Sequence, residues 1–123
     1  MHNLDRLAAQ YAQAIVQSGD QQIETTVTKA LGVLQEHGVY ACFLYLLAKE
    51  KDNGKKVVVP AMLDLLDKLD FGWSKPHNDQ PATILQHISD TVTADLERLL
   101  LAKEILEQML IYARYGAKAQ SKE

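Results

Sequence analysis

The chain has 123 residues, of which 47% are hydrophobic and 24% charged, and it contains only six glycines and three prolines. These values are ordinary for one folded globular domain and exclude a long disordered linker, so we expect a single domain over residues 1–123. The net charge of −3 argues against a strongly basic nucleic-acid-binding domain.

The sequence predicts a cytoplasmic protein. Cys42 is the only cysteine and cannot form an internal disulfide, which fits a reducing compartment. The first residues do not resemble a signal peptide. The longest apolar run, residues 39–48, is much shorter than the roughly 20 residues that span a bilayer. We therefore expect no membrane segment.

Residues 3–51 predict three helices, because apolar side chains recur at helical spacing and helix-favouring residues dominate. The first covers about residues 3–17, and the second follows Asp20, a good N-cap, and ends near His37 and Gly38. The third, about residues 39–51, is apolar nearly all round. That pattern predicts a central helix surrounded by the others.

Residues 52–80 contain the turn and loop signals. We expect a turn at 52–54 and an extended chain at 57–59, because valines favour strands and residue 59 precedes a proline. Pro60 suits the first turn of a fourth helix. Residues 70–80 form the long irregular stretch.

Pro81 is expected to open a fifth helix, and Thr93 to cap a last helix of about 25 residues that runs to about Lys118. Together these elements predict an all-α fold: a compact bundle of about six helices with a long C-terminal helix.

The last helix carries two apolar stripes. One stripe contains Leu96, Leu99, Leu100, Leu106, Met109, Leu110, Ala113 and Ala117. The other contains Leu101, Ile105, Tyr112 and Tyr115, with Ile111 between the stripes. Such a helix either lies deep in the bundle or uses its second stripe as a subunit interface, and the two interpretations are compatible.

The charge is segregated into two basic tips on an acidic body. Residues 57–107 hold nine acids and four bases. The first tip, residues 49–56, holds four lysines: Lys49, Lys51, Lys55 and Lys56. The second tip, residues 108–122, holds Arg114, Lys118 and Lys122 without an acid. Such cations are either ordinary solvated ends or phosphate contacts that read no sequence.

The sequence contains no recognisable catalytic, cofactor or metal motif. The histidines (His2, His37, His77, His87) are far apart, and three or four converging ligands would be needed for zinc. Asp64 and Asp67 fit a solvated helix face better than an acid–base pair. Cys42 lies in an apolar helix, where a buried thiol is inert. We expect a non-enzyme that needs no cofactor.

Two stretches resemble a known family. Residues 37–49 place a Gly before an apolar helix that ends in Lys, and residues 104–119 place a Glu before an apolar run that ends in Arg-Tyr-Gly-Ala-Lys. Both resemble the small subunit of type III-B CRISPR (Cmr) effector complexes, and Arg6 with Tyr11 fits the first helix of that family. The chain differs from the family pattern at Ile111, where Trp is common, and at Ala113, where Lys is common.

This resemblance implies a non-catalytic subunit in an antiviral, RNA-guided ribonucleoprotein. It would stack with copies of itself and with other subunits of the complex along the guide RNA–target RNA duplex. It would contact phosphates without reading bases. The candidate RNA-binding residues are Lys49, Lys51, Lys55, Lys56, Arg114 and Lys118.

Two other interpretations remain open. A helical protein–protein adaptor or regulator with no nucleic-acid role predicts that the basic tips lie on unrelated faces. A small metal-dependent or ligand-binding enzyme requires Asp64, Asp67 and a histidine such as His87 to converge on one pocket.

Overall fold

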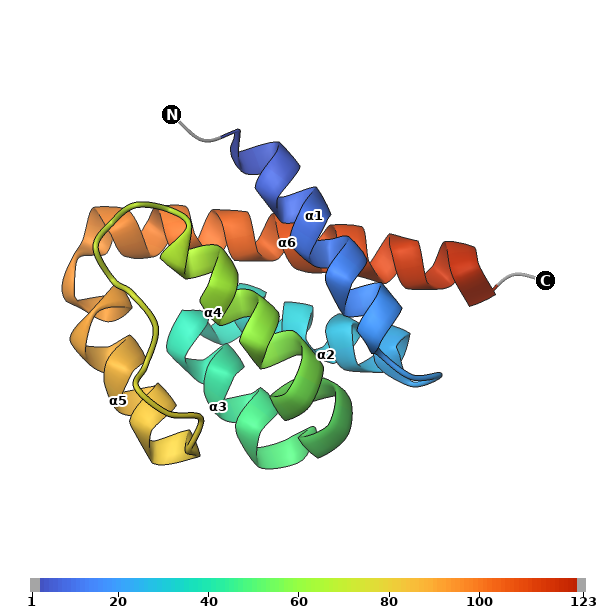
Figure 1. Ribbon diagram of the computed structural model, residues 1–123, viewed down its shortest axis with the longest axis horizontal. Helices are drawn as coiled ribbons and strands as arrows, with labels where there is room; N and C mark the ends of the chain where they lie inside the picture. Colours follow the sequence, from blue (N-terminus) through green and yellow to red (C-terminus); the bar gives the residue numbers. More distant parts are fainter. Residues whose placement is uncertain (1–2, 122–123) are drawn as a thin grey trace.

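The computed structural model describes residues 3–121 and is all-α, with six α-helices and two short helices of other types (Figure 1). Within that range no strand occurs. In chain order the elements are α1 (Leu4–Ser18), α2 (Ile23–His37), α3 (Val39–Lys49), the π-helix η1 (Lys51–Val58), α4 (Val59–Asp67), α5 (Pro81–Asp90), the 3₁₀-helix η2 (Val92–Ala94) and α6 (Leu96–Ser121). The predicted bundle with a long last helix is confirmed.

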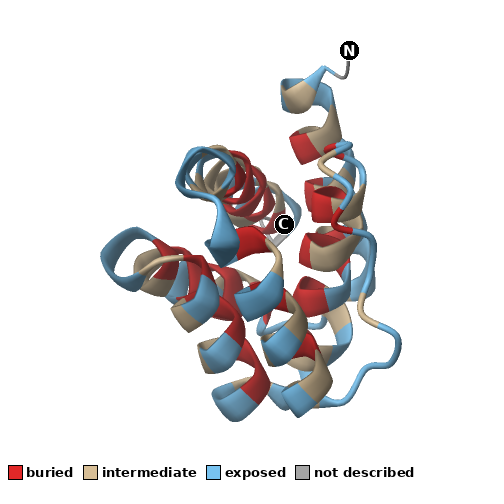
Figure 2. Ribbon diagram, turned by 90° about the vertical axis from the view of Figure 1, so that its left-hand side faces the viewer, coloured by how far each residue is buried: buried red, intermediate tan, exposed pale blue. Residues whose placement is uncertain are grey.

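The long helix α6 is the axis on which the N-terminal half packs. Both α1 and α2 make their most extensive contacts with α6, and α1 crosses over it in Figure 1. Alanines such as Ala8 and Ala12 on α1 and Ala113 on α6 are buried, which lets the helix backbones approach closely. Figure 2 shows that buried positions occupy the sides on which the helices face one another.

The third helix is less enclosed than its composition predicts. Phe43 and Leu46 are fully buried, but Tyr40 and Leu44 on the opposite side are exposed. The expectation of a helix surrounded on all sides is therefore wrong. Neighbouring helices cover one face of α3 and leave the other open.

The segment after α3 also differs from prediction. Residues 51–58 form a π-helix that leads directly into α4, where a turn and an extended segment were expected. Pro60 lies in the first turn of α4, as predicted. Val58 and Val59 are buried, so packing of these side chains overrides the preference of valine for strands.

The loop between α4 and α5 is held against the bundle by its aromatic residues. Trp73 is buried, and its ring meets that of Phe71 edge to face at 5.0 Å between centroids. Arg98 on α6 covers Phe71 at 5.0 Å and donates a hydrogen bond to its carbonyl oxygen at 3.2 Å. Residues 70–80 were predicted to be irregular, and the contacts of Phe71 and Trp73 hold this irregular loop in place.

The cap of the last helix lies two residues later than predicted, at Asp95 instead of Thr93, and α6 begins at Leu96. Thr93 donates its hydroxyl to the Ser89 carbonyl, whereas Asp95 accepts a hydrogen bond from the Arg98 backbone N–H at 3.3 Å. Asp95 therefore supplies the capping contact at the start of α6. None of the helices among residues 3–121 is long and apolar enough to cross a membrane.

Candidate functional site

The first basic tip is displayed on the α3–η1 junction. Lys49 ends α3, and the other three lysines, Lys51, Lys55 and Lys56, belong to η1. Lys56 lies 3.7 Å from Asp52, an exposed i,i+4 pair that contributes little because water screens it. The tip therefore presents four lysine side chains at one end of the bundle.

The buried Asn53 anchors this tip to the exposed Asp20 in the α1–α2 turn. The Asn53 side-chain amide donates to the Asp20 carboxylate at 2.6 Å, and the Asp20 backbone N–H donates back to the Asn53 oxygen at 3.1 Å. The hydrogen bond from Asn53, with a second from the Gln22 backbone, lowers the pKa of Asp20. The reciprocal pair fixes η1 relative to α2.

Glycine is required at the next position. A Cβ atom on Gly54 would lie 2.4 Å from Glu50 Cβ and 2.9 Å from the Leu46 carbonyl oxygen. Gly54 is buried in this close approach, and the neighbouring Lys55 N–H donates to the Glu50 carbonyl at 2.7 Å. The π-helix is therefore tightly packed onto the end of α3.

The Glu50 carboxylate joins two helices beneath the tip. It accepts hydrogen bonds from the hydroxyls of Thr26 on α2 and Tyr45 on α3, each at 3.1 Å. Burial and the acceptor Glu50 raise the pKa of Tyr45. Hydrogen bonds between α2, α3 and the segment that leads into η1 therefore fix the backbone that carries the lysines.

The second basic tip lies on the C-terminal part of α6. Lys118 pairs with Glu24 on α2 at 3.6 Å, and the Arg114 guanidinium lies 6.0 Å from the Tyr115 ring centroid. Lys122 lies outside the described residues.

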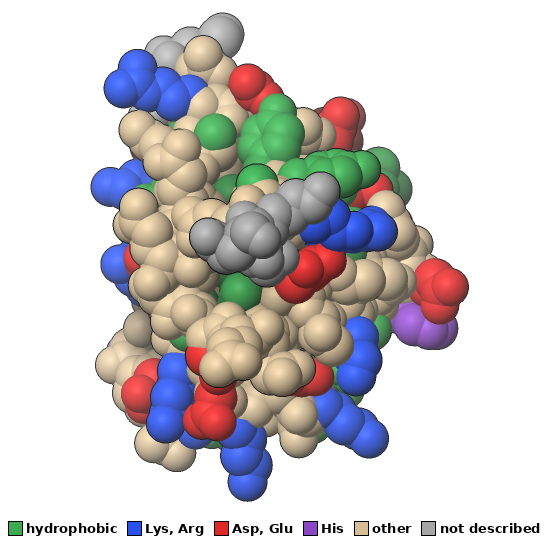
Figure 3. Space-filling model, turned by 90° about the vertical axis from the view of Figure 1, so that its right-hand side faces the viewer, with side chains coloured by type: hydrophobic (Ala, Val, Ile, Leu, Met, Phe, Trp, Pro, Cys, Tyr) green, Lys and Arg blue, Asp and Glu red, His purple; other side chains and the backbone are tan. Residues whose placement is uncertain are grey.

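The two tips are separated by the start of α2. Asp20 contacts the first tip through Asn53, whereas Glu24 pairs with Lys118 in the second. Figure 3 shows Lys and Arg side chains along the lower edge of this face and others beside the C-terminal end, with acidic and uncharged surface between them. The residues of the two basic tips therefore form two patches and not one continuous stripe.

The proposed subunit-interface residues have different environments. Ile105 is only 4% exposed and belongs to the hydrophobic core, because that side of α6 faces α1. Leu101 and Tyr112 are half-buried, and the Tyr112 hydroxyl donates to the Asp5 carboxylate. Tyr115 is 62% exposed. Only Leu101, Tyr112 and Tyr115 of the four therefore have surface that a partner could cover.

The other apolar stripe of α6 also reaches the surface. Leu96 is 69% exposed and Leu100 is 56% exposed, although their spacing predicts core positions. They lie in the first turns of α6, where α1 does not cover the helix (Figure 1). Exposed leucines in consecutive turns are candidates for a protein contact.

An open groove lies beside the first basic tip, and the sequence does not predict it. Its volume is about 550 Å³. Its lining residues come from η1, α4, the 71–80 loop and α5: Lys55, Lys56, Val59, Pro60, Leu63, Asp64, Lys75, Pro76, Asn78, Asp79 and Ile84. A second hollow of about 430 Å³, on the α5 side, shares Lys75 and Pro76 with the groove.

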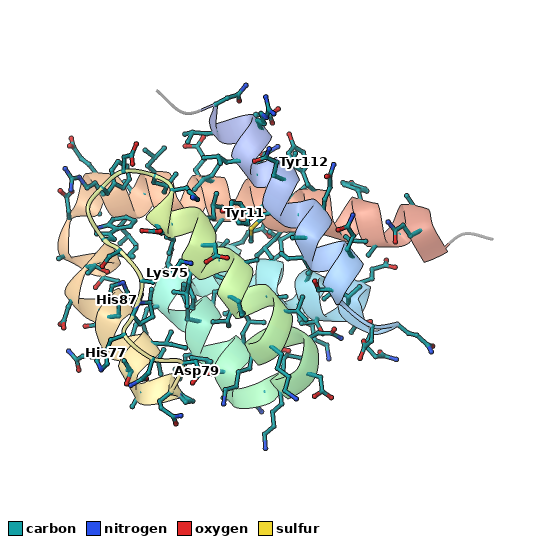
Figure 4. The ribbon with its side chains drawn as sticks, viewed as in Figure 1. Tyr11, Lys75, His77, Asp79, His87 and Tyr112 are labelled. Atoms are coloured by element: carbon teal, nitrogen blue, oxygen red, sulfur yellow. The ribbon has the colours of Figure 1, made fainter. Side chains whose placement is uncertain are left out.

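Polar contacts hold the loop that forms one wall of this groove. Lys75 pairs with Asp64 on α4 at 2.6 Å, which raises the pKa of Lys75. Burial and the nearby Asp64 carboxylate raise the pKa of Tyr11 on α1. His87 Nε2 on α5 lies 3.2 Å from the Ser74 carbonyl oxygen, to which it donates. In Figure 4, Lys75 lies toward α4 and His77 toward α5.

Asp64, Asp67 and His87 do not form a metal pocket. Asp64 is paired with Lys75, and His87 is directed to the loop backbone. Across residues 3–121, no group of three or more His, Cys, Asp or Glu side chains could hold a metal ion. Burial raises the pKa of Cys42 to about 12, so its thiol is protonated and unreactive in the folded chain.

No family model matches the chain, and neither curated proteins nor solved structures gave a significant match.

Proposed function

We propose that the chain is a non-catalytic small subunit of a type III-B CRISPR RNA-guided effector complex in the cytoplasm. In this role it stacks with copies of itself and other subunits along the guide RNA–target RNA duplex. It contacts phosphates without reading bases and serves antiviral defence. The proposal rests on the resemblance of residues 37–49 and 104–119 to the Cmr small subunit, together with the surface described above.

The observation that carries the RNA contact is the rigid mounting of the first basic tip. Lysines on a flexible loop lose side-chain and backbone entropy when they bind. Here Asn53, Gly54 and Glu50 fix the backbone beneath the lysines through hydrogen bonds and close packing. Lysines carried on a fixed backbone lose less backbone entropy when they bind phosphates, and such contacts do not involve base edges.

The partly exposed side chains of α6 support subunit stacking. Leu101, Tyr112 and Tyr115 leave partly or largely exposed apolar surface beside α1. Tyrosine is favoured in protein interfaces because it covers a large area with few rotatable bonds. In the proposed complex this surface contacts a neighbouring subunit.

A specific observation favours a second candidate, a helical adaptor with no nucleic-acid role. Asp20 and Glu24 lie between the two basic tips, and carboxylates between cations weaken the attraction for a phosphate chain. The exposed Leu96 and Leu100 offer an apolar contact surface instead. In this candidate the tips are solvated ends.

Charge reversal in the assembled complex tests the proposal. We expect Lys55→Glu with Lys56→Glu and Lys118→Glu to weaken RNA retention, most strongly at low salt, because phosphate contacts are electrostatic. The control replaces Lys29, Lys68 and Lys103, which lie outside both tips, by Glu with the same change in net charge. Equal retention by the two triple variants at every salt concentration would refute the RNA contact.

A further inference from the structure

The groove beside the first basic tip combines a cationic rim with an apolar floor. Val59 and Ile84 are buried beneath it, and Leu63 is half-buried. Pro60 and Pro76 add apolar ring surfaces. The volume of about 550 Å³ lies within the usual range for small-ligand sites, which are mostly apolar with a few placed polar groups.

The charges on the rim favour an anion. Lys75 and Asp64 neutralise one another at 2.6 Å. Lys56 has only a weak, exposed contact with Asp52, and Lys55 makes no side-chain ion pair with another residue in the described part of the chain. Two adjacent ammonium groups are therefore available on one side of the groove, opposed by the single carboxylate of Asp79.

The opposite wall supplies a polar group from the loop that leads into α5. Asn78 accepts a hydrogen bond from the Gln80 backbone N–H at 2.9 Å, which orients its side chain and leaves its NH₂ group as a donor beside the groove. The Lys75–Asp64 and His87–Ser74 contacts hold this wall in place. The groove therefore lies between two anchored segments, η1 and the 71–80 loop.

We infer that this groove binds one nucleotide unit, with the phosphate against Lys55 and Lys56 and the ribose and base over Leu63 and the proline rings. An apolar floor between charged rims fits a molecule that has a flat organic part and one anionic end. The inference rests on the proposed RNA contact for its natural ligand, an unpaired nucleotide of an RNA strand beside the guide RNA–target RNA duplex. A free nucleotide presents the same chemistry.

Amide chemical shifts of the full-length, ¹⁵N-labelled chain test the site directly. The probes are AMP, inorganic phosphate and an adenosine hexanucleotide RNA, all at one ionic strength. We expect AMP to shift the amides of Lys55, Leu63, Asn78 and Ile84, and to bind at least about tenfold more tightly than phosphate because the floor contacts the base and ribose. Equal affinity for AMP and phosphate, or shifts that avoid these residues, would overturn the inference.

A pair of matched double variants separates the groove from general electrostatics. Lys55→Glu with Lys56→Glu should weaken AMP binding by about tenfold or more, since two charge-assisted contacts with the phosphate are replaced by repulsion. Lys49→Glu with Lys51→Glu makes the same charge change on the same tip but outside the groove, and should change the affinity by less than about threefold. Equal loss in both pairs would refute a localised site. Lys55→Gln with Lys56→Gln gives the same test if the acidic pair unfolds the tip.

The results also distinguish this inference from the proposed function. Binding of the hexanucleotide through Lys55 and Lys56 supports an RNA ligand, whereas binding of AMP alone supports a free nucleotide. A groove that binds neither, while an assembled complex still retains RNA through the tips, overturns only the nucleotide site. A groove that binds nucleotides in a protein found in no RNA-guided complex overturns only the proposed function.

Discussion

Replacing Gly54 by alanine should strongly destabilise the chain, because the first basic tip is packed too closely to accept a Cβ atom. The added methyl group would lie 2.4 Å from Glu50 Cβ and 2.9 Å from the Leu46 carbonyl oxygen. Neither atom is the free end of a flexible side chain, so the backbone of η1 or α3 must move. Overpacking typically costs about 1–3 kcal/mol, and contacts this short place Gly54→Ala near the upper end, about 3 kcal/mol.

This cost is large relative to the total. At about 0.05–0.15 kcal/mol per residue, a chain of 123 residues has a free energy of unfolding of roughly 6–18 kcal/mol. A loss of about 3 kcal/mol should lower the melting temperature by roughly 10 °C. The movement of η1 should also weaken RNA retention by an assembled complex, because the lysines share that backbone.

Urea unfolding of Gly54→Ala and of Gly32→Ala provides the measurement and its control. Gly32 lies within α2, and a Cβ atom there meets no heavy atom within 4 Å. Alanine at this position should stabilise the chain by about 0.5–1 kcal/mol, because it reduces the entropy lost on forming the helix. A free energy of unfolding for Gly54→Ala within about 0.5 kcal/mol of the wild type would refute the packing argument.

Three further predictions concern the titration of Asp20, the accessibility of Cys42 and the affinity of the isolated chain for RNA. Because hydrogen bonds lower the pKa of Asp20 in the folded chain, its carboxylate stabilises the fold above the ordinary pKa, and this contribution disappears as pH falls through the lowered one. The difference in unfolding free energy between wild type and Asp20→Ala should thus be constant from pH 5 to 7 and shrink below about pH 4, and a difference that grows on acidification would contradict this. Alkylation of Cys42 at pH 8 should require unfolding, since burial raises its pKa to about 12, and rapid alkylation in native buffer would refute its burial. The isolated chain should bind RNA more weakly than about 1 µM at physiological salt, as measured by fluorescence anisotropy, because one copy reaches few phosphates and Asp20 and Glu24 oppose them; submicromolar binding would contradict this.

Helical periodicity and proline position predicted most of the helices. Pro60 and Pro81 open α4 and α5 as expected, and Gly38 separates α2 from α3. These signals are local, because proline fixes its own backbone angle and glycine accepts the positive φ of 99° found at Gly38. They need no knowledge of the tertiary structure.

The first basic tip shows why the remainder could not be predicted. Asn53 and Gly54 are typical turn residues, yet both are buried in a π-helix by contacts with Asp20 and with the end of α3. Asp20 is 33 positions away from Asn53 along the chain. No local pattern of residues 51–59 contains that contact, so turn and strand propensities gave the wrong structure.

The candidate sites could be predicted only in part, because they too depend on contacts between residues that are far apart in the sequence. Charge segregation identified both basic tips, but it could not place Asp20 and Glu24 between them. The groove depends on the ion pair that joins Lys75 of the irregular loop to Asp64, and on α5 packing against α3 so that it faces α4 across the groove. On α6, the apolar stripes predicted an interface position for Ile105, which is buried, and a core position for Leu100, which is exposed. The path of α1 across α6 decides which side of the helix is covered, and the spacing of apolar residues does not contain that path.

Affinity purification of the tagged full-length chain from its native cell tests the central claim most directly, with RNA sequencing and mass spectrometry of everything that co-purifies. The account predicts short repeat-derived guide RNAs together with several large protein subunits, and loss of the RNA from the Lys55→Glu, Lys56→Glu, Lys118→Glu variant at moderate salt. Protein partners without any guide RNA would contradict it and would support the helical adaptor.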